Sequence, residues 1–220
     1  LPSQCKDGYV VKVVNTFEDE DDYYVQFFAE GAADSGAGVW EETVAPGVEI
    51  EIDPTTMPHV IRRLGDGTFE ASPVKWIKRE VGDNLTNPLP TIIGQKLNKA
   101  IFFRNRMVFL AGENVVFSVA NEYYNLFAIT AKTISDADPI DLLVSSTYPS
   151  VLYDAIATAA GLLLLADNQQ FLVVAGSTEV FSPSTAVAKA VGSYKYNTKV
   201  RPVNTGQSVG FLNDCLLYTS

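Results

Sequence analysis

The segment FFRNRMVFLAGENVVFSVANEYYNLF, residues 102–127, decides the fold class. Short runs of aromatic and β-branched residues alternate in it with polar residues, first at Asn105 and Arg106 and again at 111–114. Such runs between turn-forming residues are typical of β-strands. Together with the preceding Ala100 and Ile101, the segment predicts three short strands joined by tight turns, an antiparallel meander.

The polar residues Arg104, Asn105 and Arg106 are interpreted as structural or interface residues and not as a reactive site. Asparagine tolerates positive φ and bonds its own backbone, so Asn105 is suited to the centre of a turn. The arginines on either side are expected to pair with carboxylates or carbonyls of a neighbouring blade or subunit. This interpretation leaves little room for a catalytic role of these three residues.

The same pattern returns in GLLLLADNQQFLVVAGSTEVFS, residues 161–182, and VGFLND, residues 209–214, is expected to start it once more. Asn105, Asn168 and Asn213 are taken as equivalent turn residues, at intervals close to the roughly 40–50 residues of a propeller blade. The all-apolar LLLL run predicts a strand buried on both faces. The sequence therefore favours propeller-like blades that bury their faces against one another.

The chain as a whole is predicted to be mainly β. Residues 1–80 are expected to form an N-terminal antiparallel β unit, residues 81–98 a Pro-rich connection, and residues 99–214 a partial set of propeller-like blades. Residues 215–220 are expected to be a non-native tail.

Strands of the first unit are predicted at Tyr9–Val14, Tyr23–Phe28 and Val39–Val44, with a Gly-rich turn before the last. Asp66-Gly67 predicts a hairpin with a two-residue turn of the primed type. Helix signals are scarce, and 121–128 and 149–160 are the only plausible short helices.

Charge and composition exclude several classes of protein. Residues 1–53 hold 13 of the 26 acidic residues but 2 of the 16 basic ones, with the centre of the acidity at Glu18–Asp22. This acidic run is interpreted as a solvated loop. No basic patch for gripping phosphates is present, which disfavours tight nucleic-acid binding. No apolar run reaches the about 18 residues of a membrane span. The missing start Met and basic leader indicate a fragment.

Candidates for chemistry are few, and we assign no catalytic, cofactor-binding or metal-binding residue. His59 is the single histidine, without a second ligand nearby. Asp136, Asp138 and Asp141 form the best carboxylate cluster, but they lack the spacing and closing glutamate of a calcium loop. We expect them in a turn, a cap or an interface, and with Arg104 and Arg106 they are the best interface candidates.

Several motifs follow the order found in the nozzle proteins of short-tailed podovirus bacteriophages, the tail tubular protein B family, which the chain resembles over roughly residues 1–214. They are TMPHVIRRLGDGTF at 56–69, the stretch 81–127, DADPIDLLVSS at 136–146 and LLLLADNQQFLV at 162–173. Ala137 stands where the family more often has Asp. The last six residues, Cys215–Ser220, depart from the family and are given no role.

The resemblance implies a structural virion protein, not an enzyme, with a propeller-like central part. Six copies would form a tapering tube below the adaptor ring of tail tubular protein A, dock tail fibres and hold the canal through which the genome leaves. An acidic local balance would be compatible with a canal wall, because carboxylates repel passing phosphates. Before infection the subunits would hold the canal closed.

Two rival functions stay open at this point. One is a propeller glycoside hydrolase that uses two of Asp136, Asp138 and Asp141 as acid and base. The other is a receptor- or carbohydrate-binding module in which Trp76, Tyr123 and Tyr124 stack on a ligand.

Overall fold

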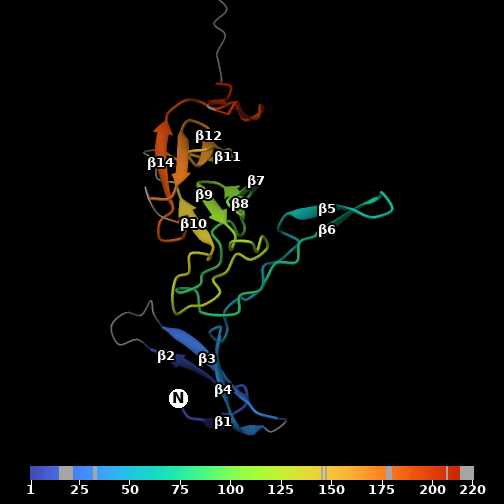
Figure 1. Cartoon of the computed structure of the whole chain (residues 1–220), viewed down its shortest axis with the longest axis vertical. Coiled ribbons are helices and arrows are strands. Elements are labelled where there is room, and N and C mark those ends of the chain that lie inside the picture. The colour runs from blue at the N-terminus through green and yellow to red at the C-terminus, as the bar shows by residue number, and fades with distance from the viewer. Residues whose placement is uncertain are drawn as a thin grey trace, which may run out of the picture. The chain divides into compact units, whose positions relative to one another are not determined.

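The computed structural model describes residues 1–14, 22–31, 34–144, 146, 148–176, 180–206 and 208–213, so most of the acidic loop and the tail lie outside the described residues. The described chain is mainly β, in several antiparallel sheets and without a helix, as Figure 1 shows. It divides into two compact units. The first comprises Leu1–Leu89 with Tyr124–Ser135, and the second Pro90–Tyr123 with Asp136–Ser220.

The first unit contains a four-stranded antiparallel sheet in the order β1-β4-β3-β2. Its strands are β1 (Gln4–Lys6), β2 (Val10–Val13), β3 (Tyr23–Ala29) and β4 (Ser35–Thr43). The predicted strands are thus confirmed, but β4 begins inside the segment expected to be a Gly-rich turn. Val25 and Phe27 of β3 are buried, and Phe27 meets the edge of Trp40 at a centroid distance of 5.1 Å.

A separate hairpin of β5 (His59–Arg63) and β6 (Phe69–Pro73) follows in the same unit. The expected two-residue turn at Asp66-Gly67 is wrong. Leu64 donates its amide to the carbonyl of Thr68, 2.8 Å away, so three residues form the turn. Gly67 takes a φ of 87°, and the carboxylate of Asp66 accepts a bond from the Thr68 amide.

The second unit opens with the predicted meander, which is confirmed. The strands β7 (Leu97–Phe103), β8 (Arg106–Ala111) and β9 (Asn114–Phe117) pair in sequence. A fourth strand, β10 (Ile140–Leu143), pairs with β9 and completes the sheet in the order β10-β9-β8-β7.

A second four-stranded meander follows, with the order β11-β12-β13-β14. It consists of β11 (Leu152–Ala157), β12 (Leu162–Ala166), β13 (Gln170–Val174) and β14 (Val187–Gly192). The LLLL run is β12, and Leu162, Leu164 and Leu165 are fully buried, as predicted. The helix expected at 149–160 is wrong, because its apolar residues form β11. The helix expected at 121–128 is also wrong: these residues form turns and bends.

The two meanders share one hydrophobic core. Its largest members are Phe103, Leu110, Phe117, Ile140, Leu152, Leu162, Leu164, Phe171 and Phe181. Both sheets contribute to it, so neither could bury its apolar face without the other.

The third start, VGFLND, forms only the short strand β16 (Val209–Gly210), which pairs with β15 (Val203–Asn204). The assumed equivalence of Asn105 and Asn168 is wrong. Asn105 lies in the turn between the first and second strands of its meander, whereas Asn168 lies between the second and third of the next. The described residues form no closed barrel or propeller. Among them no helix is long and apolar enough to cross a membrane.

Candidate functional site

The predicted turn is built from Arg104 and Asn105. Phe103 pairs with Arg106 across the strands, so Arg104 and Asn105 are the two central residues, with φ values of 47° and 57°. Positive φ at both positions is the geometry of a primed hairpin turn, which follows the twist of the strands. Arg104 therefore lies inside the turn, and Arg106 is the first residue of β8.

Arg106 is buried, with 2% of its surface exposed. Its Nη1 donates to the carbonyls of Ser118 at 2.7 Å, Ala137 at 3.1 Å and Asp138 at 2.6 Å, and Nη2 donates to that of Asp136 at 2.6 Å. Burial lowers the pKa of the Arg106 guanidinium, and the charge of Asp138 opposes this. An arginine keeps its charge in proteins, so a cation is held here by backbone dipoles.

These bonds join two points that are distant along the chain. After Tyr123 the chain leaves the second unit for residues 124–135, which belong to the first, and it returns at Asp136. We call residues 124–135 the excursion. Arg106 holds Ser118 on the outgoing side and 136–138 on the returning side, and Ala120 donates to the Ala137 carbonyl at 2.9 Å. The guanidinium therefore ties together the two ends of the excursion within the second unit.

Arg104 has a different environment. Its side chain is exposed, and its guanidinium carbon lies 5.4 Å from the ring centroids of both Phe103 and Phe181. These distances are those of cation–π contacts. Arg104 thus covers the aromatic edge of the shared core.

The three aspartates do not form one carboxylate cluster around a common centre. Asp136 and Asp138 contribute backbone carbonyls to Arg106. Asp141, at the start of β10, accepts bonds from the Thr91 amide at 2.8 Å and the Thr91 hydroxyl at 2.6 Å. Within the described ranges, no group of three or more His, Cys, Asp or Glu side chains is arranged to hold a metal ion.

A second buried arginine supports the first unit. Arg79 is 1% exposed and donates through Nη1 to the Asn87 carbonyl at 2.9 Å and the Asn84 side chain at 3.0 Å, and through Nη2 to the Glu49 carbonyl. It also lies over the ring of Phe127, at 5.7 Å. Burial lowers the pKa of the Arg79 guanidinium. The carbonyls that accept its hydrogen bonds replace the water that it loses on burial.

The excursion is fixed in the first unit by two further polar side chains. Asn87 both donates to and accepts from the backbone of Ala128, at 3.1 and 2.9 Å. Glu42 on β4 accepts bonds from the Thr130 hydroxyl at 2.9 Å and the Ala131 amide at 2.5 Å. Sequence reasoning missed Arg79, Asn87 and Glu42, because nothing in their local patterns indicates a contact some 40 to 90 residues away.

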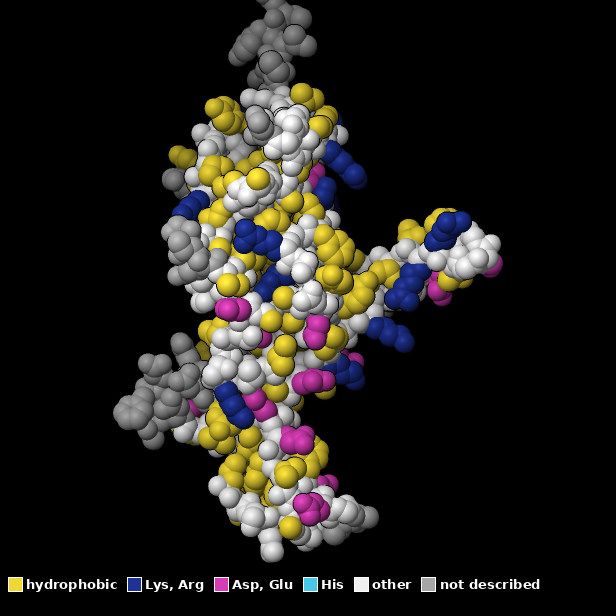
Figure 2. Space-filling view, in the orientation of Figure 1, with side chains coloured by type: hydrophobic (Ala, Val, Ile, Leu, Met, Phe, Trp, Pro, Cys, Tyr) yellow, Lys and Arg dark blue, Asp and Glu magenta, His cyan; other side chains and the backbone are white. Residues whose placement is uncertain are grey.

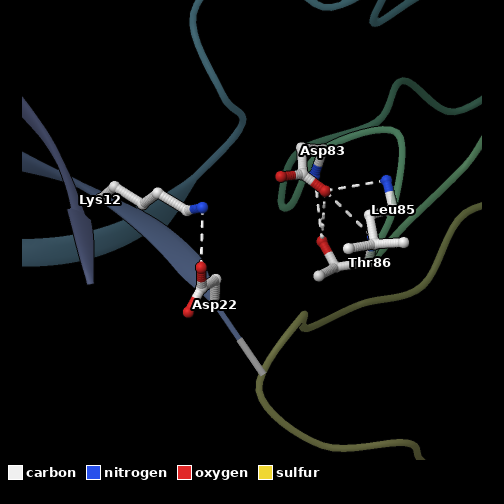
Figure 3. Close-up of polar contacts among 5 residues, drawn as sticks. All are labelled: Lys12, Asp22, Asp83, Leu85 and Thr86. Carbon is white, nitrogen blue, oxygen red and sulfur yellow. Dashed lines mark hydrogen bonds and ion pairs between the residues drawn. The ribbon is translucent and has the colours of Figure 1, made fainter. Parts of the chain in front are cut away.

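Figure 3 shows two polar contacts of the first unit, the ion pair of Lys12 with Asp22 and the turn built on Asp83. The Lys12 ammonium lies 2.7 Å from Asp22, whose hydrogen bond raises the pKa of Lys12. The carboxylate of Asp83 accepts bonds from the amides of Leu85 and Thr86, at 2.9 and 3.0 Å. Burial alone would raise the pKa of Asp83, but these bonds outweigh it and lower the pKa below the usual 3.8.

Comparison with known proteins identifies the family. The family model described as bacteriophage nozzle protein matches residues 1–220. The chain belongs to this family. It is also 33% identical over 221 residues to tail tubular protein gp12 of Escherichia phage T7, and the match covers 100% of this chain and 27% of that protein. The chain thus spans about a quarter of the length of this curated relative.

The resemblance to phage nozzle proteins is therefore confirmed, and the chain is a structural phage tail protein located in the tail of the virion. The interface roles of Arg104, Asn105, Arg106, Asp136, Asp138 and Asp141 stay predictions. The structure brings Arg106 together with the backbone of 136–138, places Arg104 on the adjacent aromatic edge, and sets Asp141 against Thr91.

Replacing Arg104 with alanine is expected to lower the stability of the second unit of the nozzle chain by about 0.5–1 kcal/mol, because two exposed cation–π contacts are lost. Alanine takes the same positive φ at position 104 as arginine does, so the substitution does not change the backbone strain of the turn. Thermal unfolding of the full-length protein would measure the effect, and no catalytic turnover should change. An unaltered melting temperature together with unaltered assembly would contradict the prediction.

Replacing Asp83 with alanine is expected to cost about 0.5–2 kcal/mol at neutral pH, since two amides lose their acceptor. The folded pKa is lowered, so the ionised carboxylate stabilises the fold above its usual pKa of 3.8, and this stabilisation is lost as the pH falls through the folded value. The difference between the natural protein and the variant should therefore shrink on acidification.

Denaturant unfolding of the full-length protein at neutral pH and well below pH 3.8 would measure this difference. Asp83→Asn is the matched control, because it keeps an acceptor without a titrating group. A gap between natural protein and alanine variant that stays constant on acidification would refute the assigned role of the charge.

Proposed function

We propose that this chain forms part of the wall of a homohexameric tail nozzle that encloses the canal for genome ejection. In this proposal β7–β10 and β11–β14 are neighbouring blades of a propeller-like region, completed by other parts of the full-length protein. The protein acts mechanically and not as an enzyme. Its partners are further copies of itself, the adaptor tail tubular protein A and the tail fibre, and viral DNA passes without specific binding.

The observation that carries this proposal is the neighbour relation of the two meanders. The first strands, β7 and β11, lie side by side: the Asn98 side chain donates to the Leu152 carbonyl at 2.8 Å. The last strands, β10 and β14, also contact each other. In a propeller each blade is a meander whose first strand faces the axis and whose last strand lies at the rim. Two blades in sequence would show this arrangement.

A third contact supports the same interpretation. Asn204 on β15 donates its side-chain amide to the Ala157 carbonyl at the end of β11, 2.8 Å away. Asn98 on β7 thus bonds the first residue of β11, and Asn204 on β15 bonds its last residue. The hairpin β15–β16 is then the inner part of a third blade.

The excess of acidic residues in one part of the chain supports a canal wall that does not bind DNA. The excess of acidic residues over basic ones lies in residues 1–53. Carboxylates near a passing phosphate backbone repel it, so the genome would slide past such a surface.

Electron microscopy of the full-length protein, alone and in isolated tails, tests this function. Sixfold rings or tubes with propeller-like density at 97–192 are expected. Isolated monomers under all conditions would overturn the hexamer, and density with separated sheets would overturn the blades. Hydrolysis of a polysaccharide panel that is lost in Asp138→Asn would favour a glycosidase instead.

Carbohydrate binding is a second candidate function that one observation favours. Trp76 and Tyr124 meet edge to face at 6.0 Å, and both line an open cavity of about 800 Å³ in the first unit. Aromatic rings in a cavity of this size suit a sugar ligand. Tyr123 does not join them, because it packs on Phe102 in the second unit. Glycan-array binding that is lost in Trp76→Ala would support this candidate.

A further inference from the structure

The hairpin β5–β6, residues 59–73, carries an uncovered apolar face, and we call this hairpin the arm. Ile61 pairs with Ala71 and Arg63 with Phe69, so these four side chains lie on one face. Ile61 is 74% and Phe69 71% exposed. Figures 1 and 2 show the arm standing apart from the sheet of its own unit, with hydrophobic, basic and acidic side chains on the visible side.

An isolated two-stranded hairpin is marginally stable in water, and exposed apolar clusters mark interaction surfaces. Neither β5 nor β6 pairs with another strand in the described part of the chain. On the opposite face, Arg62 and Glu70 line the cavity of the first unit. The apolar face with Arg63 is therefore the side that needs a partner, and it carries no acidic residue.

A complementary surface lies on the four-stranded sheet of the same unit. Phe28 pairs with Val39 and Gln26 with Glu41, which places these side chains on one face of β3 and β4. Phe28 is 41% and Val39 53% exposed, and Glu41 is exposed beside them. This face offers apolar side chains and a carboxylate, whereas the arm offers apolar side chains and a guanidinium.

These two surfaces do not cover each other within one chain, because the apolar side chains of both remain exposed. A surface that is complementary to a different surface of the same molecule makes a head-to-tail contact, and such contacts generate rings. We propose that the arm of one copy packs on the β3–β4 face of the next copy, with Phe69 against Phe28 and Val39 and with Arg63 opposite Glu41. This inference rests on the proposed homo-oligomeric nozzle and names the contact that closes it.

Charge reversal in the full-length protein tests the contact. Arg63→Glu and Glu41→Arg should each weaken association about tenfold or more, because like charges would then face each other. The double variant should recover most of this loss. Arg201→Glu, which reverses the charge of an exposed arginine in the second unit, is the matched control and should assemble as the natural protein does. Light scattering over a dilution series measures the association.

A cross-linking experiment locates the contact independently of stability. Phe69→Cys and Val39→Cys are prepared separately in a full-length background in which the other cysteines, Cys5 among them, are replaced with serine, then mixed and oxidised. A dimer that forms in the mixture but in neither variant alone supports the proposed contact between copies. Association that is unchanged in both charge variants, with no dimer in the mixture, overturns the arm contact but leaves the nozzle in place. A natural protein that never associates overturns the nozzle and this inference together.

Discussion

Replacing Arg106 with alanine is expected to destabilise the second unit by about 3–5 kcal/mol, because several backbone carbonyls lose hydrogen bonds from a charged donor, which are worth about 1.5–3 kcal/mol each. Four carbonyls, of Ser118 and of residues 136–138, lose a charged donor, and those of Ser118 and Asp138 belong to buried residues. Ala137 keeps the bond from the Ala120 amide, so the cost is smaller than four separate losses. The two ends of the excursion should come apart before the strands do.

Hydrogen exchange of the full-length protein, followed by mass spectrometry of peptides, measures this local effect. Peptides that contain 118–120 and 136–140 should lose protection first. Arg106→Lys is the matched control: it retains the charge but lacks the planar fork, so an intermediate loss is expected. Arg104→Ala, two residues away, should leave these peptides protected. Protection of 136–140 that stays unchanged in Arg106→Ala would refute the tie.

The meanders could be predicted from the sequence because each strand is a local pattern. The apolar run Met107–Leu110 marks a strand, and Asn105 marks the turn before it. The same pattern of short strands and turns led to a wrong alignment of the two meanders. Asn105 and Asn168 look alike because asparagine suits any tight turn, but they lie in different turns of their meanders. Short strands with the same sequence pattern do not indicate which position each of them takes in its sheet.

The sequence predicts that Arg106 pairs with carboxylates or carbonyls of a neighbouring blade or subunit, but its partners are carbonyls of its own unit, and the places that the long-range ties connect could not be predicted. A buried arginine such as Arg79 or Arg106 reads in sequence as a surface residue, because arginine is usually exposed. Their partners are backbone carbonyls, which every residue carries, so no residue type at the other end signals the contact. The return of residues 124–135 to the first unit depends on these ties and on Asn87. This return produces no periodic pattern in the sequence from which it could be predicted.

Replacing Phe117 with alanine is expected to cost about 3–5 kcal/mol, as removal of a fully buried phenylalanine does. Phe117 on β9 is inaccessible to solvent and forms a triangle of rings with Phe103 and Phe181, at centroid distances of 6.5 and 5.3 Å. Because both meanders share this core, protection against hydrogen exchange should fall in β12 and β13 as well as in β8 and β9.

Phe102→Ala removes the same side chain from the neighbouring hairpin and is the matched control. Phe102 is 54% exposed and meets only the edge of Tyr123 among the aromatic contacts of the described residues, so its loss should cost about 1 kcal/mol or less. If Phe117→Ala weakened β8 and β9 but left β12 and β13 fully protected, the two sheets would be independent folding units. The shared apolar core is the largest contact between the two meanders, so such independence would also remove the physical basis of the proposed propeller-like wall.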